Sequence, residues 1–209
     1  MRPRTDASAS PPTSPPADSP HPVPVIVSPE QFTLIDFDAE EIRLLTADLL
    51  AKVGLDPDAD VHVEVNETSP LGFTQITSLD PVTLYLESGA LEDPKRPRQL
   101  SPEGAQNVIG RLLLEVSDRL DPDFGAPPLD EPLDPPLANA WHIYCAGRLD
   151  QLGYRYFDQR QRRLYHFRNR HGFTDRADAA FDRLWAGDGL TFAQIQTLSD
   201  QALGAPAAS

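Results

Sequence analysis

The sequence is poor in residues that form covalent cross-links or span membranes. It has a single cysteine, Cys145, among 209 residues, which excludes an internal disulfide framework and a four-cysteine zinc site. No stretch approaches the roughly 18 consecutive apolar residues that cross a bilayer. The N-terminus also lacks the apolar run and cleavage site of a secretory signal. The sequence therefore predicts a cytoplasmic protein without a membrane segment.

Positive charge is scarce as well. Lysine and arginine together number 18 against 32 aspartates and glutamates, so the formal net charge is -14. A chain with this charge repels nucleic acid at long range, although salt partly screens the repulsion. The charge therefore disfavours nucleic acid as a partner without excluding it.

Proline is concentrated near the N-terminus. Of the 22 prolines, nine fall within residues 1–29, among serine, alanine, threonine and aspartate. This composition is typical of a disordered arm. The sequence then predicts a single α+β domain over residues 30–204 and a disordered tail over residues 205–209.

The order of predicted elements within the domain begins with a helix over residues 38–54, where Asp38 is the cap and Gly54 the stop. Alternating apolar residues with short links then predict a small antiparallel sheet of three strands. About five helices follow the sheet. The predicted strands span residues 61–65, 72–77 and 82–87, and the helices span 101–120, 137–153, 158–171, 174–185 and 190–203.

One segment carries charge of the opposite sign to the rest of the chain. Residues 154–171 contain six arginines and one aspartate, a local charge of +5, so the remainder carries -19. Helical spacing predicts a core face of Leu164, Phe167 and His171 and a separate basic stripe, although the aromatic residues also permit a β-hairpin. The candidate contact surface comprises Arg160, Arg162, Arg163, His166, Arg168 and Arg170.

Several partners suit such a surface. Guanidinium groups match phosphate oxygens and aromatic rings can stack on bases, so a phosphorylated ligand, a protein or a nucleic acid are all open. The stripe can equally form structural ion pairs or hold the chain's own acidic loop at Asp121, Asp123, Asp130, Glu131 and Asp134. A second anion site is the mixed-charge segment 88–101 with its helix start at Ser101 and Pro102.

Residues 114–118 decide whether the sequence contains the zinc-binding motif of a metallopeptidase. The order of strands and helices resembles the minimal zincin metallopeptidases, whose helix after the strands carries HExxH. Here that frame reads Leu114-Glu115-Val116-Ser117-Asp118, so the glutamate is present and both histidines are missing. The resemblance implies an inactive zincin-like domain. The alternative is that Glu115 is simply an exposed partner of Arg111 or Arg119 on the same helix.

Other side chains that could bind a metal ion or act as a nucleophile are scattered along the chain. His142 and Cys145 lie one helical turn apart, and His166 and His171 are further candidates for a metal or a Cys-His pair with Asp150 or Asp175. Packing of Cys145 as a small apolar residue is the simpler interpretation. We expect no metal, no cofactor and no catalysis. The sequence predicts a binding or scaffolding protein that uses the arginine-rich and aromatic surface.

A second resemblance concerns lineage. The runs "RRLYHFRNRHGFTD" and "AWHIYCAGRL" are similar to proteins of unknown activity from high-GC actinobacteria. This resemblance indicates ancestry and gives no information about activity.

Overall fold

The computed structural model describes residues 25–56, 59–156 and 159–204. Most of the predicted N-terminal arm and the predicted tail at 205–209 lie outside the described residues. Within these ranges, no helix combines the length and the apolar character that crossing a membrane requires.

A four-stranded mixed sheet forms one layer of the molecule. Its strands are β1 (Val25–Ser28), β2 (Val61–Asn66), β3 (Thr74–Leu79) and β4 (Val82–Glu87), in the order β1-β2-β4-β3. β1, β2 and β4 run parallel, and β3 pairs antiparallel with β4. The short helix η1 (Ser88–Ala90) leads into a separate hairpin of β5 (Glu92–Asp93) and β6 (Arg96–Leu100).

The prediction of an antiparallel three-stranded sheet after an N-terminal helix is wrong. β1 precedes the first helix, and helix α1 (Ala39–Val53) connects β1 to β2 as the crossover that parallel strands need. β4 then lies between β2 and β3, so β2 does not pair with β3. The boundary of the predicted arm at residue 29 is also wrong, because Val25 and Val27 are buried in β1.

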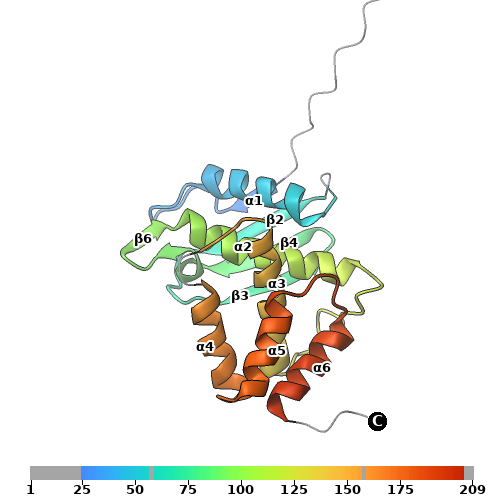
Figure 1. Cartoon of the computed structure of the whole chain (residues 1–209). Coiled ribbons are helices and arrows are strands. Elements are labelled where there is room, and N and C mark those ends of the chain that lie inside the picture. Colours follow the sequence, from blue (N-terminus) through green and yellow to red (C-terminus); the bar gives the residue numbers. More distant parts are fainter. Residues whose placement is uncertain (1–24, 57–58, 157–158, 205–209) are drawn as a thin grey trace, which may run out of the picture.

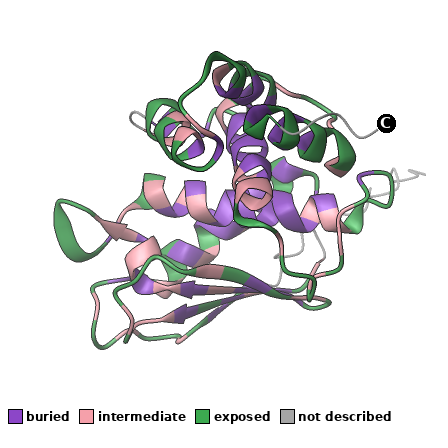
Figure 2. Ribbon diagram, turned by 90° about the horizontal axis from the view of Figure 1, so that it is seen from below, coloured by how far each residue is buried: buried purple, intermediate pink, exposed green. Residues whose placement is uncertain are grey.

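The described residues form six α-helices, of which two cover the sheet and four build a further layer. α2 (Pro102–Leu120) lies against the sheet beside α1, and Figure 2 shows the remaining helices on the other side of α2. They are α3 (Pro135–Gln151), α4 (Gln159–His171), α5 (Asp175–Trp185) and α6 (Phe192–Leu203). In Figure 1, α4, α5 and α6 lie side by side at the end of the molecule away from α1. The α+β class and the helix order are therefore confirmed.

α3 forms the centre of the helical layer. Its Trp141 and Tyr144 are almost fully buried, and the ring of Phe124 contacts both. Phe124 comes from the proline-rich connection between α2 and α3, and its carbonyl accepts a hydrogen bond from the amide of Phe192 at 2.9 Å. Phe124 thus anchors the connection between α2 and α3, a segment whose proline-rich composition predicts irregular structure.

A close approach of α3 and α5 depends on Gly147. A Cβ atom at this position would lie 2.0 Å from the carbonyl oxygen of Trp185, which is backbone and cannot rotate away. Gly110 on α2 serves as a comparison for Gly147. The atom nearest to a Cβ added at Gly110 would be a side-chain atom, Cδ2 of Leu149, at 2.8 Å.

We expect Gly147→Ala to lower the free energy of unfolding by about 2 to 3 kcal/mol, the usual effect of overpacking. Gly110→Ala should cost less, because Leu149 can change rotamer and alanine favours the helix by about 1 kcal/mol. Urea denaturation of both variants measures the difference. Equal stabilities would contradict the close α3–α5 approach.

Candidate functional site

The basic segment forms a helix, α4, and not a hairpin. Phe167 and His171 are buried on its core side, and their rings stack with centroids 3.8 Å apart. Leu164 also packs against the core. The cations therefore fall on the flanks and the outer face of α4, as the helical spacing predicts.

Two of the predicted contact residues are structural. Arg168 forms a two-pronged ion pair with Asp178 of α5, with nitrogen–oxygen distances of 2.7 and 2.5 Å. Arg160 pairs with Asp182 of α5 at 2.6 Å. Their carboxylate partners come from α5, and across the described residues no ion pair joins α4 to the acidic loop after α2, so the structure lends no support to the docking hypothesis.

The other cations of the set have no ion-pair partner within the described part of the chain. Arg162, Arg163 and His166 line a groove, whereas Arg170 is exposed further along the same helix. Arg163 is half-buried, and this burial, together with the nearby charge of Arg111, lowers the pKa of its guanidinium to about 10. Arg163 therefore remains a cation at neutral pH.

The groove consists of two adjoining cavities. The larger has a volume of about 680 Å³ and lies between the β5–β6 hairpin, the start of α2 and the start of α4. The smaller has a volume of about 380 Å³ and extends along α2 and α4. Pro94, Tyr156 and Arg162 line both cavities.

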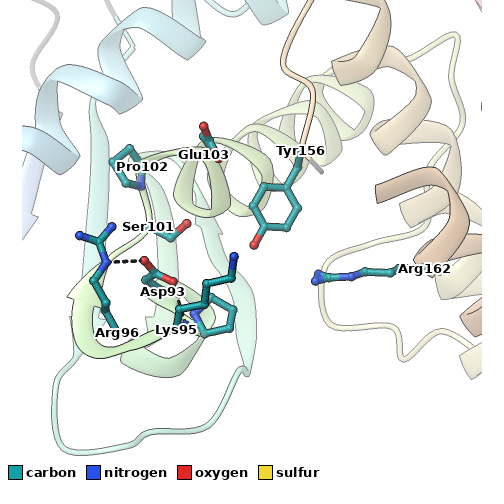
Figure 3. Close-up of a pocket in the computed structure, with 9 residues that line it drawn as sticks. Asp93, Lys95, Arg96, Ser101, Pro102, Glu103, Tyr156 and Arg162 are labelled. Carbon is teal, nitrogen blue, oxygen red and sulfur yellow. Dashed lines mark hydrogen bonds and ion pairs between the residues drawn. The ribbon is translucent and has the colours of Figure 1, made fainter. Parts of the chain in front are cut away.

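The larger cavity brings cations from two distant segments together. Figure 3 shows the side chains of Lys95 and Arg162 pointing toward one another, with the Tyr156 hydroxyl between them. The Arg162 guanidinium carbon lies 5.5 Å from the centroid of the Tyr156 ring. The start of α2 adds the positive end of a helix dipole, where the Ser101 hydroxyl accepts a hydrogen bond from the Gly104 amide at 3.1 Å.

Three carboxylates border the groove, and two of them are already engaged. Asp93 accepts hydrogen bonds from the Lys95 amide at 2.8 Å and from Arg96 at 2.9 Å. Glu92 accepts from the Ser88 hydroxyl and from the Arg98 amide. Glu103, at the start of α2, is the third, and its exposed side chain has no hydrogen bond or ion pair among the described residues.

The exposed aromatic residues of the basic segment do not line this groove. Tyr165 and Phe173 are 58% and 64% exposed, and their ring centroids lie 6.1 Å apart. Tyr156, which precedes α4, is instead the aromatic residue of the groove. Sequence reasoning identified the α4 cations and the anion-accepting helix start separately. It did not predict that the two segments form one groove, because about sixty residues of sequence separate the two walls.

The four candidate metal donors are not assembled. Among the described residues, no group of three or more histidine, cysteine and acidic side chains is placed to hold a metal ion. His171 bonds the Ser199 hydroxyl at 2.9 Å and the Phe167 carbonyl at 3.1 Å. Burial raises the pKa of the Cys145 thiol, with the nearby Asp118 acting in the same direction, so this cysteine is a poor nucleophile.

The residues of the zincin frame form a network of charges between α2 and α3. Glu115 is buried, contrary to its predicted exposure, and pairs with Arg111. The Nε2 atom of His142 lies 3.4 Å from Glu115, but burial and neighbouring arginines lower the pKa of this imidazole, so it is neutral at neutral pH. Asp118 accepts hydrogen bonds from the Trp141 indole at 2.7 Å and from Arg148 at 2.7 Å. Guanidinium groups thus take the place beside these carboxylates that a metal ion would need.

Comparisons with known proteins identified no relative of this chain. No family model, curated protein or solved structure matches the chain.

The buried His171 should make stability depend on pH. Burial lowers the pKa of its imidazole below the ordinary 6.5, so the unfolded chain binds more protons than the folded one as the pH falls from 6.5 to the folded pKa. The free energy of unfolding should therefore fall over that window and be independent of this group above it.

We expect His171→Gln to have a flatter pH dependence than the wild type between pH 7.5 and 5, measured by urea denaturation. The slope that remains belongs in part to His142, whose pKa burial and the neighbouring arginines also lower. Identical slopes in the two proteins would show that His171 is not held neutral.

Proposed function

We propose that this protein binds a phosphate-bearing anionic ligand in the groove between α4 and the β5–β6 hairpin, without catalysing a reaction. One observation carries the proposal. Arg162 and Arg163 line the groove without a carboxylate partner among the described residues, while Arg160 and Arg168 of the same helix are paired with α5.

The chemistry of the groove suits a phosphate group. A guanidinium presents several donors in a plane that matches phosphate oxygens, and the Lys95 ammonium adds a mobile point charge. Backbone amides at the start of a helix also favour an anion. Asp93 and Glu92 oppose this charge weakly, because Arg96 and hydrogen bonds already engage them.

A second candidate is a zincin-like domain that has lost its metal. The sheet is followed by a helix that retains a buried glutamate, Glu115, in the frame where the peptidases carry theirs. Leu114 cannot ligate a metal, and Arg111 pairs with Glu115. Both features support a non-catalytic role, and this candidate is compatible with anion binding at the groove.

Removing a positive charge and removing a negative charge from the groove should change the affinity for an anion in opposite directions. We expect Arg162→Ala to weaken binding of pyrophosphate about tenfold, because a hydrogen bond to a charged group contributes about 1.5 to 3 kcal/mol. Glu103→Gln should strengthen it, because this carboxylate repels the ligand from the start of α2. Isothermal titration calorimetry at low salt measures both affinities.

Arg170→Ala is the matched control, since it removes an exposed arginine of the same helix that lies outside the groove and has no ion-pair partner among the described residues. Its affinity for pyrophosphate should equal that of the wild type. Equal losses in Arg170→Ala and Arg162→Ala would mean that net charge alone governs binding, and the proposal would fail.

The metal-free candidate makes a separate prediction. Purified, untagged protein should contain far less than one zinc ion per chain by mass spectrometry, and a chelator should leave its melting temperature unchanged. Near-stoichiometric zinc together with a melting temperature that falls in chelator would overturn the non-catalytic proposal.

A further inference from the structure

We infer that the ligand of the groove is a nucleoside phosphate, with its phosphate in the larger cavity and its base in the smaller one. This inference rests on the proposed function and names the class of ligand. It follows from a difference in chemistry between the two adjoining cavities.

The larger cavity suits the phosphate. It contains Lys95 and Arg162, whose side chains point toward one another, and it reaches the start of α2 at Ser101. These groups are cations and hydrogen-bond donors. A phosphate between them would contact both walls of the groove.

The smaller cavity contains a pair of buried amides. Asn107 on α2 is 6% exposed and Gln159 on α4 is 7% exposed, yet both line the cavity. The Gln159 amide donates to the Asn107 carbonyl oxygen, and the Gln159 carbonyl oxygen accepts from the Tyr156 amide at 3.4 Å. The Asn107 amide nitrogen is left without a partner among the described residues.

The Asn107 amide nitrogen is not enclosed by protein, so it faces the open space of the cavity, where an acceptor of the ligand can replace water. The edge of a nucleobase supplies carbonyl oxygens and ring nitrogens that accept such a bond, and side-chain amides pair well with base edges. Asn107 does not line the larger cavity, where the phosphate is placed.

The other walls of the smaller cavity suit the flat face of a base. Val108, Ala90 and Pro94 contribute apolar surface, and the Tyr156 ring lies at the junction of the two cavities. Aromatic rings favour stacking on bases irrespective of sequence. The cavities have volumes of about 680 and 380 Å³, which is within or near the usual range of small-ligand sites, about 300 to 1,000 Å³.

Competition between fragments of the ligand tests the inference. The full chain would be titrated at low salt with pyrophosphate, ribose 5-phosphate and the common nucleoside 5′-monophosphates, which differ from ribose 5-phosphate by the base. We expect at least one nucleotide to bind tenfold or more tightly than ribose 5-phosphate. Arg162→Ala should weaken the binding of all three classes.

Variants in the smaller cavity separate the base from the phosphate. Asn107→Ala and Val108→Trp should reduce nucleotide affinity to the level of ribose 5-phosphate and leave pyrophosphate affinity unchanged. Val108→Trp fills the cavity without removing a hydrogen bond, so it keeps the test decisive if Asn107→Ala folds poorly. Gln161→Ala, at an exposed position of α4, is the control and should bind like the wild type.

The outcomes distinguish the inference from the proposed function. Equal affinity for ribose 5-phosphate and every nucleotide, or tighter binding of a phosphoserine peptide, would overturn the inference and leave anion binding intact. Failure of pyrophosphate and all the organic phosphates to bind would overturn both.

Discussion

A buried carboxylate joins the two halves of this protein. Asp118, near the end of α2, accepts hydrogen bonds from Trp141 and Arg148 of α3. Burial raises the pKa of Asp118, and the charge of Arg148 opposes that rise. Breaking a buried pair of this kind is strongly destabilising, because the remaining charge has no partner. The position of α3 on α2, and with it the whole helical layer, depends on this contact.

The groove follows from where that layer is held. α3 supports α4 and α5, and α5 supplies the carboxylates that pair with Arg160 and Arg168. Together with the burial of Phe167 and His171, these pairs orient α4 on the helical layer. Arg162, Arg163 and His166 are then directed at the start of α2. Paired and unpaired cations on one helix thus have different roles, the first orienting the helix and the second facing the cavity.

Sequence reasoning succeeded where the signal was local. The periodicity of residues 159–171 predicted the helix and its buried Phe167 and His171, because a 3.6-residue repeat depends only on neighbouring turns. The sheet was mispredicted because β1 is only four residues long and follows a proline-rich stretch. Strand pairing is a long-range property that alternation alone does not specify.

The candidate site divides in the same way. The cations of α4 were recognisable from composition, but their separation into paired and unpaired members depends on α5, and the opposite wall is a hairpin far along the chain. Asn107 and Gln159 gave no signal at all. Each is an ordinary polar residue on an amphipathic helix, and their significance appears only when α2 and α4 bury them against one another.

The charge around the groove would limit the size of the ligand that we propose. Residues 154–171 carry +5 within a chain of net charge -14, so the rest of the protein carries -19. At physiological salt, charges interact over about 8 to 10 Å. A compact phosphate in the groove is therefore governed by Lys95, Arg162 and Arg163, whereas a long polyanion would extend over the acidic remainder and be repelled. This charge distribution disfavours nucleic acid strands and is compatible with the small phosphorylated ligand that we propose.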